Sequence, residues 1–307
     1  MLFGNMVEQY IWFDGKFVKF KNANVHILTH SMQYGSGIFE GIRSYQSNGN
    51  SYVFRLEDHI SRFMKSAKIY TMNLKFSEKK LADAVVATLK KNKLKAAYIR
   101  PFAFYNDQHI GLGVSGKKIS IAIITVPFGS YFANKEKGIS CKVSSWQRIN
   151  SMILPPEAKA SGNYINSIIA SIDAQKSGAD EAILLSQEGH VAEGPGENVF
   201  FVEDGTLITP SREADILMGI TRDTIIKLAE YNGLSVVERN VHKEEMYTCD
   251  EAFFTGTAAE VTPITSIDSR KIGNGKVGPI TSMLADKYYE VVSGSNPEFK
   301  DWLTKVF

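Results

Sequence analysis

The chain has little cysteine, almost no net charge and no apolar run of membrane-spanning length. Its 307 residues include two cysteines, Cys141 and Cys249, too far apart for a CxxC motif or a metal-ligand spacing, which predicts free thiols in a reducing compartment. A formal net charge of +2 gives no electrostatic reason to expect a nucleic-acid or anionic-membrane partner. The N-terminus lacks a basic segment followed by an apolar one, so we expect a cytoplasmic protein without a signal peptide.

Common catalytic and cofactor motifs are missing as well. Only two of the six histidines, His26 and His30, share a helical spacing, and Ile27 stands where an HExxH zinc motif needs glutamate. No GxSxG motif of a hydrolase occurs. The segment 111–116 matches the GxGxxG dinucleotide fingerprint, but a β-branched strand follows where that fingerprint requires a helix, which favours a loop between strands. We therefore expect no metal site, hydrolase triad or nucleotide-binding fold.

Helical and strand patterns mix along the chain, with several hairpins. Residues 10–19 predict a hairpin around Asp14-Gly15, and residues 57–70 predict a helix with one apolar face. This mixture predicts an α/β fold with antiparallel pairing, not a uniformly parallel doubly wound sheet. A turn-prone, charged stretch suggests three parts: a small N-terminal α/β domain at 1–126, an interdomain linker at 127–137 and a larger C-terminal α/β domain at 138–307, which carries Lys159.

Lys159 lies in a stretch of unusual composition. Pro155 and Pro156 precede it, so we expect the chain to reach it in an extended conformation, and small residues follow before a helix begins at Tyr164. A lysine among small residues at a strand-to-helix turn has few partners. When partly desolvated, its pKa falls, and the amine becomes a nucleophile able to form a Schiff base. The alternative is a solvated surface lysine, the common case in a chain with 35 lysines and arginines.

Three further stretches suggest which kind of cofactor such an amine would bind. Residues 219–222 open a helix with Thr221 as the expected N-cap, and residues 255–259 end a strand. Both expose backbone N–H groups to an anion, although each alone is also compatible with an ordinary cap or turn. With Arg62 they would form a monophosphate pocket. The Gly- and Pro-rich turn after Glu193 either exposes a solvated carboxylate or fixes one beside a protonated heteroaromatic nitrogen. An amine, a phosphate site and a partner for the ring nitrogen are the three protein groups that bind pyridoxal phosphate.

Four motifs at residues 157–164, 193–200, 219–222 and 255–260 resemble those of the class IV pyridoxal-phosphate aminotransferases, most closely the branched-chain-amino-acid aminotransferases. The resemblance spans nearly the whole chain. It implies a fold type IV architecture, pyridoxal 5′-phosphate as cofactor and a homo-oligomer, either a dimer or a hexamer of dimers. The implied reaction is transamination between leucine, isoleucine or valine and 2-oxoglutarate, giving branched 2-oxo acids and L-glutamate.

Other readings stay open on the sequence. Within the same fold they are a D-amino-acid aminotransferase, an R-selective amine transaminase and an aminodeoxychorismate lyase. Outside it they are a non-catalytic pyridoxal-phosphate-binding protein and a nucleotide-binding protein. The Tyr98-Ile-Arg100 stretch, together with the aromatic pair Tyr34 and Phe39, favours the branched-chain enzyme.

The resemblance also implies a role for each matching residue. Lys159 would be the catalytic residue, joined to the cofactor and later transferring a proton, and Glu193 would pair with the pyridine nitrogen. The implied cofactor-binding residues are Arg62, Lys159, Tyr164, Glu193, Gly196, Glu197, Asn198, Leu217, Gly219, Ile220, Thr221, Gly256 and Thr257. The implied substrate-binding residues are Tyr34, Phe39, Gly41, Tyr98, Arg100, Phe128, Tyr131, Thr257, Ala258 and Ala259. Arg100 would receive the distal carboxylate of glutamate. Phe128 replaces a tryptophan of many bacterial members, so we expect a difference in side-chain preference.

Overall fold

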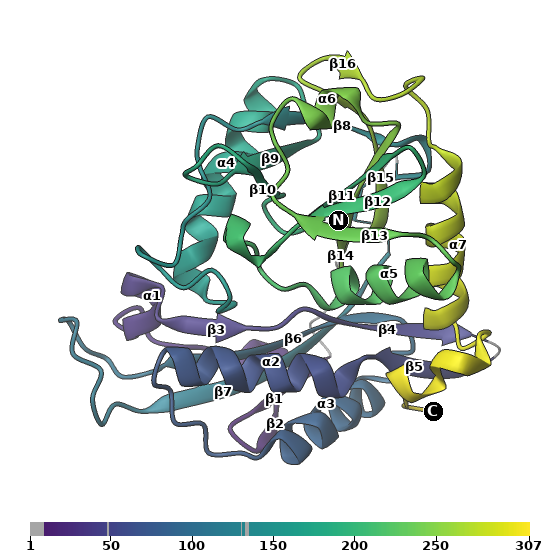
Figure 1. Cartoon of the computed structure of the whole chain (residues 1–307). Helices are drawn as coiled ribbons and strands as arrows, with labels where there is room; N and C mark the ends of the chain where they lie inside the picture. The colour runs from purple at the N-terminus through teal and green to yellow at the C-terminus, as the bar shows by residue number, and fades with distance from the viewer. Residues whose placement is uncertain (1–8, 48, 130, 133–134) are drawn as a thin grey trace. The chain divides into compact units, whose positions relative to one another are not determined.

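The computed structural model describes residues 9–47, 49–129, 131–132 and 135–307, and the chain divides into two compact units (Figure 1). The first unit runs through Gly129 and takes in Ala158–Gly162 and Val291–Phe307, and the second consists of Ser130–Glu157 and Asn163–Glu290. The two late segments belong to the first unit because Ala160 bridges to Ile38 and the last strand pairs with an early one.

The first unit is built on an antiparallel sheet. Among the described residues its strands are β1 (Tyr10–Phe13), β2 (Lys16–Lys19), β3 (Gly37–Phe39), β4 (Ile42–Ser47), β5 (Asn50–Phe54), β6 (Ala97–Tyr105), β7 (Ile119–Pro127) and β17 (Leu303–Lys305). Its helices are α1 (His30–Tyr34), α2 (Leu56–Ile69) and α3 (Glu78–Asn92), with 3-10 turns η1 (Phe20–Asn22) and η5 (Pro297–Trp302). The strand order is β17-β5-β4-β6-β7-β1-β2, and β3 pairs with β6. The predicted hairpin is confirmed as β1 and β2.

Helices α2 and α3 pack on this sheet through their apolar faces. Ile60, Phe63 and Ala67 of α2 are buried in the first core, as the periodicity of residues 57–70 predicts. Leu81 and Val85 of α3 join the same core. A second stripe of α2, spaced three and four residues apart, is also buried but polar, and this stripe forms part of the candidate site described below.

The second unit combines parallel and antiparallel strand pairs. Its strands are β8 (Ile139–Val143), β9 (Glu181–Leu185), β10 (Val191–Glu193), β11 (Asn198–Glu203), β12 (Thr206–Pro210), β13 (Val236–Arg239), β14 (Glu251–Gly256), β15 (Glu260–Ile267) and β16 (Arg270–Lys271). Its helices are α4 (Tyr164–Lys176), α5 (Ile220–Tyr231), α6 (Glu245–Thr248) and α7 (Pro279–Val292), with 3-10 turns η2 (Lys135–Lys137) and η4 (Arg212–Ala214). Because β10 pairs with both β9 and β11, the strands β10-β9-β8-β15-β14-β11 close into a ring.

Two helix starts in this unit depend on residues outside the helix. The expectation that Thr221 caps α5 is wrong: Gly219, which has no side chain, is the N-cap, and Thr221 is buried within the first turn. The N-terminus of α7 is held by the buried Glu251, whose carboxylate accepts from the backbone N–H groups of Ile280 and Thr281 and from the Thr281 hydroxyl. A carboxylate at this position also complements the helix dipole.

Candidate active site

The backbone around Lys159 is fixed from both sides within the first unit. A turn at Pro156–Glu157 precedes it, so the expected extended approach is wrong, and the 3-10 turn η3 (Ser161–Asn163) follows it. Lys159 N donates to the Ser66 hydroxyl at 3.1 Å, and its carbonyl accepts from Phe39 N at 2.9 Å. These two bonds set the position from which the lysine side chain starts.

The Lys159 amine lies in surroundings that disfavour its charged form. Burial, and secondly the positive charge of Arg62, lower its pKa to about 8, although the carboxylate of Glu40 acts in the opposite direction. The Nζ atom lies 5.0 Å from the centroid of the Phe39 ring. With a pKa of about 8, about a quarter of the amine is neutral at pH 7.5, against about 0.1% for an ordinary lysine. This amine can therefore act as a nucleophile and as a base near neutral pH.

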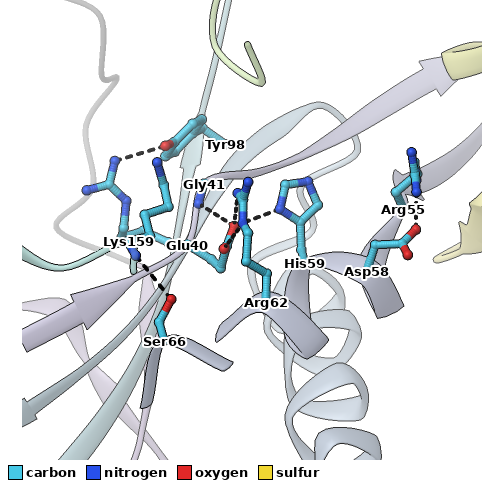
Figure 2. A network of polar contacts seen from close by, with 10 residues as sticks. Glu40, Gly41, Arg55, Asp58, His59, Arg62, Ser66, Tyr98 and Lys159 are labelled. Carbon is cyan, nitrogen blue, oxygen red and sulfur yellow. Dashed lines mark hydrogen bonds and ion pairs between the residues drawn. The ribbon is translucent and has the colours of Figure 1, made fainter. Parts of the chain in front are cut away.

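A buried carboxylate, Glu40, joins two residues of α2 (Figure 2). Arg62 donates from Nε to Oε1 at 2.7 Å and from Nη2 to Oε2 at 2.9 Å, and His59 Nδ1 lies 2.7 Å from Oε2. Burial would raise the pKa of Glu40, but the charge of Arg62 and the bonds from His59 and Arg62 hold this pKa well below its usual range. Burial lowers the pKa of His59 despite the nearby carboxylate, so the ring is neutral at pH 7.

Strand β6 places Tyr98 and Arg100 beside the Phe39–Gly41 segment. Arg100 Nη2 donates to the Tyr98 hydroxyl at 2.9 Å, and the Arg100 guanidinium lies 4.4 Å from the centroid of the Phe39 ring. A Cβ atom at Gly41 would lie 2.2 Å from the Tyr98 hydroxyl oxygen, so a larger residue at this position would displace the phenol. The ring of Phe128 lies 5.3 Å from that of Tyr98. An arginine, a phenol and aromatic rings thus lie side by side within the first unit.

The second unit holds its own buried carboxylate, Glu193. Arg148 Nη2 donates to Oε1 at 2.8 Å, while Oε2 accepts from Asn198 Nδ2 at 2.9 Å and from Leu217 N at 3.1 Å. Glu193 and Asn198 are cross-strand partners at the ends of β10 and β11, which explains their spacing in the sequence. Both ionic side chains, Glu193 and Arg148, are at most 7% exposed. The carboxylate is therefore ionised and oriented by three donors.

The turn between β10 and β11 packs closely against the rest of this unit. Gly196 N donates to the Glu197 carboxylate at 3.0 Å, and a Cβ atom at Gly256 would lie 3.3 Å from the Gly196 carbonyl. A Cβ atom at Gly219 would lie 2.0 Å from Asn198 Oδ1, so only glycine fits ahead of α5. The start of α5 is thereby brought to the Glu193 turn.

The remaining predicted residues are spread over both units. Thr257, Ala258 and Ala259 form the turn between β14 and β15, whereas Thr255 belongs to β14 and is buried. Tyr164 is the first residue of α4. Tyr131, in the second unit, is 44% exposed and packs edge-on against Phe132.

The structure brings together part of the predicted set within each unit. In the first unit Phe39, Gly41, Arg62, Tyr98, Arg100, Phe128 and Lys159 form one group. Tyr34 contacts other residues: its hydroxyl accepts from Gly111 N at 3.2 Å and its ring packs on His30. In the second unit Glu193, Gly196, Glu197, Asn198, Leu217, Gly219 and Gly256 form another group.

Sequence reasoning missed four residues of these groups: Glu40, His59, Ser66 and Arg148. The sequence spacing could have identified His59 and Ser66, because they lie three residues before and four residues after Arg62 and therefore share its helical face. Glu40 interrupts an apolar Gly-Ile-Phe-Glu-Gly-Ile run, which also could have drawn notice. Arg148 carried no signal, because its pairing with Glu193 depends on tertiary structure alone.

Metal-binding groups, membrane-spanning helices and reactive thiols also bear on function. Within the described ranges, no group of three or more histidine, cysteine or acidic residues is arranged to hold a metal ion. None of the helices described is both long enough and apolar enough to cross a membrane. Cys141 and Cys249 are free, as predicted. Both are buried, and burial raises the pKa of Cys249 to about 12.

Comparison with known proteins defines the family. A family model described as amino-transferase class IV matches residues 37–267, and the chain belongs to this family. Among its relatives, the branched-chain-amino-acid aminotransferase of Pseudomonas aeruginosa is 43% identical over 298 residues, which cover 96% of this chain and 97% of the relative. This bears out the resemblance, and the chain belongs with the branched-chain-amino-acid aminotransferases of class IV.

Solved structures give the same answer for the fold. A branched-chain aminotransferase from Thermoproteus uzoniensis, determined with norvaline, has a TM-score of 0.94 and 44% identity and covers 97% of this chain and 99% of that one. A branched-chain amino acid aminotransferase from Thermobaculum terrenum, determined in its PLP form, has a TM-score of 0.93 and 40% identity. The match covers 99% of this chain and 100% of that one. The mixed α/β fold type IV architecture is therefore confirmed.

Proposed function

We propose that this protein is a pyridoxal-phosphate-dependent transaminase that moves the amino group of leucine, isoleucine or valine to 2-oxoglutarate. The observation that carries the proposal is the Lys159 amine, which is buried beside Arg62, has its backbone fixed on both sides and has a pKa lowered to about 8. The relatives named above support the choice of amino acids, since they are branched-chain aminotransferases, and one of them was determined in its PLP form, which supports the cofactor.

The chain contains the donors that the proposed cofactor needs. Lys159 supplies the amine, the ionised and oriented Glu193 supplies a partner for a pyridine nitrogen, and Arg62 supplies a cation for a phosphate. Ile220 and Thr221 lie in the first turn of α5, and the backbone amides and dipole at a helix N-terminus favour an anion. When bound, pyridoxal phosphate supplies an aldehyde that captures amines and a ring that withdraws electrons from the substrate Cα.

The residues of the chain then have distinct tasks. Lys159 would hold the cofactor between turnovers, and its neutral Nζ would accept the proton of the substrate Cα and deliver it to the cofactor carbon that carried the aldehyde. Glu193 stays ionised because Arg148, Asn198 and Leu217 N donate to it, so it favours the protonated form of the ring nitrogen. We also assign Tyr164 to the ring hydroxyl and the Thr257 and Ala258 amides to the substrate carboxylate, following the family resemblance.

Two kinds of substrate must use one side-chain pocket, and the first unit contains groups for both. The Phe39 ring is a wall for an aliphatic side chain. Arg100 lies against that ring, and its Nε is buried without a hydrogen-bond partner among the described residues, which suits an incoming carboxylate. We propose that Arg100 binds the distal carboxylate of 2-oxoglutarate and stacks on Phe39 when the substrate is apolar.

We further propose that the chain works as a homo-oligomer. Ile27, Met32, Ile110 and Leu112 are between 60% and 79% exposed. Their two segments lie side by side, since Thr29 bridges to Gln108. An exposed apolar surface of this kind is typical of an interface, and a second copy of this chain is the occupant we propose. Light scattering should show a dimer or larger assembly, and Leu112→Glu should shift it toward monomer; a wild-type monomer would contradict the proposal.

One titration tests the proposed reaction. L-leucine added to the loaded protein should bleach the visible absorbance of the cofactor, and 2-oxoglutarate should restore it. Lys159→Ala should abolish turnover, whereas the control Lys79→Ala, at a lysine whose side chain is 84% exposed, should leave turnover unchanged. Bleaching by D-alanine but not by L-leucine would point to a D-amino-acid aminotransferase. A protein that shows no absorbance change with any amino acid would contradict the proposal altogether.

A further inference from the structure

The polar face of α2 has an order that the proposed reaction does not by itself explain. His59, Arg62 and Ser66 share this face, and Ser66 supports the Lys159 backbone (Figure 2). His59 and Ser66 are each 1% exposed, and the Arg62 side chain is 14% exposed. Glu40, from the β3–β4 connection, receives bonds from both His59 and Arg62.

We propose that Glu40 and His59 are positioning residues that hold the Arg62 guanidinium in the orientation required to bind the cofactor's phosphate. The inference rests on the proposed function, in which Arg62 contacts that phosphate. It assigns no contact with the cofactor to Glu40 or His59 themselves.

The geometry of the ion pair supports this role. Arg62 meets Glu40 with Nε on one oxygen and Nη2 on the other, so the guanidinium plane is fixed and the direction of the opposite edge, which carries Nη1, is fixed with it. An arginine held by a single bond could rotate and would lose more entropy on binding an anion. Glu40 is itself fixed, because Gly41 N lies 3.3 Å from Oε2 and His59 Nδ1 lies 2.7 Å from the same oxygen.

His59 has a separate part in this arrangement. Its Nδ1 faces a carboxylate oxygen, so Nδ1 carries the proton and donates it. The buried ring is neutral, which means that it orients Glu40 without competing with Arg62 for the negative charge. Asparagine can place a similar N–H donor at this distance from the backbone, whereas leucine cannot.

Binding of pyridoxal phosphate and of pyridoxal to the apoprotein separates positioning from a general structural role. Only the first ligand has a phosphate. The Kd of pyridoxal divided by the Kd of pyridoxal phosphate therefore reports phosphate recognition, and this ratio falls when that recognition is lost. Glu40→Gln should reduce this ratio by roughly 10- to 100-fold, the range for losing charge-assisted hydrogen bonds. His59→Leu should reduce it by about 5-fold, and His59→Asn should restore it to near the wild-type value.

Asp58→Asn provides the matched control. Asp58 is also on α2 and pairs with Arg55 at 2.7 Å, but its side chain is 49% exposed (Figure 2). The control removes the same charge from an arginine pair on the same helix and should leave the ratio unchanged. If Glu40→Gln fails to fold, as circular dichroism would show, the two His59 variants decide the question.

The outcomes distinguish this inference from the function on which it rests. If Arg62→Ala reduces the ratio but Glu40→Gln and His59→Leu leave it unchanged or increase it, the positioning role is wrong and the proposed function stands. Equal weakening of both ligands by Glu40→Gln would likewise overturn the inference. A wild-type protein that binds neither ligand would overturn the proposed function and the inference together.

Discussion

Replacing Gly41 with alanine should impair the use of 2-oxoglutarate more than the use of leucine. The added Cβ atom would lie 2.2 Å from the Tyr98 hydroxyl oxygen. Ordinary contact between these atoms needs about 3.4 Å, so the phenol must move by about 1 Å. The Tyr98 hydroxyl accepts from Arg100 Nη2 at 2.9 Å, and a shift of about 1 Å would break this bond unless Arg100 followed.

The magnitude follows from the role proposed for Arg100. A hydrogen bond involving a charged group contributes about 1.5–3 kcal/mol, which corresponds to roughly 10- to 100-fold in kcat/KM. We expect a loss of this size in the half-reaction with 2-oxoglutarate and about 3-fold or less with leucine, whose side chain has no carboxylate to bind. Stopped-flow measurement of the two half-reactions checks the ratio directly.

Two variants make the interpretation specific. Gly113→Ala adds a Cβ atom with no neighbour within 4 Å and should leave both half-reactions unchanged. Combining Gly41→Ala with Tyr98→Phe removes the clashing hydroxyl and should restore thermal stability without restoring the preference for 2-oxoglutarate. Equal losses with both substrates would refute the reasoning, since they would show that the phenol and Arg100 do not discriminate between the substrates.

Three further outcomes can be measured independently. Arg148→Met should lower the free energy of unfolding in urea by about 3–5 kcal/mol because it leaves Glu193 buried without its cation, and Arg148→Lys should lower it by less. Reductive modification of Lys159 by pyridoxal and borohydride should speed up about tenfold per pH unit below pH 8 and level off above it, because only the neutral amine reacts; a rate still rising at pH 10 would contradict the lowered pKa. Glu251→Ala should cost about 2–3 kcal/mol, since three donors at the start of α7 lose their acceptor, while kcat stays unchanged.

Local patterns in the sequence were sufficient to predict most elements of the fold. Helix α2 carries apolar periodicity, α4 begins at Tyr164 as expected, and the Asp14-Gly15 turn marks the β1–β2 hairpin. The closed ring of strands could not be predicted in this way. It depends on β10, which has three residues and pairs on both sides, and nothing in three residues shows that both edges are used.

The errors near Lys159 and α5 have a common physical reason. Local rules favoured Thr221 as a cap because threonine can accept at that position. In the structure Asn198 approaches the chain so closely that a side chain at position 219 would clash with it, and the helix begins two residues earlier than a cap at Thr221 would allow. The prolines before Lys159 likewise suggested an extended approach, but Pro156 lies in a turn. Tertiary contacts decided both cases.

The two buried ion pairs show why motif matching found only half of each. In the first unit the proposed functional group is the cation, Arg62, and the carboxylate of Glu40 supports it. In the second unit the proposed functional group is the carboxylate, Glu193, and the cation of Arg148 supports it. A motif preserves the group that meets the ligand, whereas the supporting partner comes from a distant segment of the chain. Because burying either functional charge alone would cost several kcal/mol, each required a partner that its own motif could not provide.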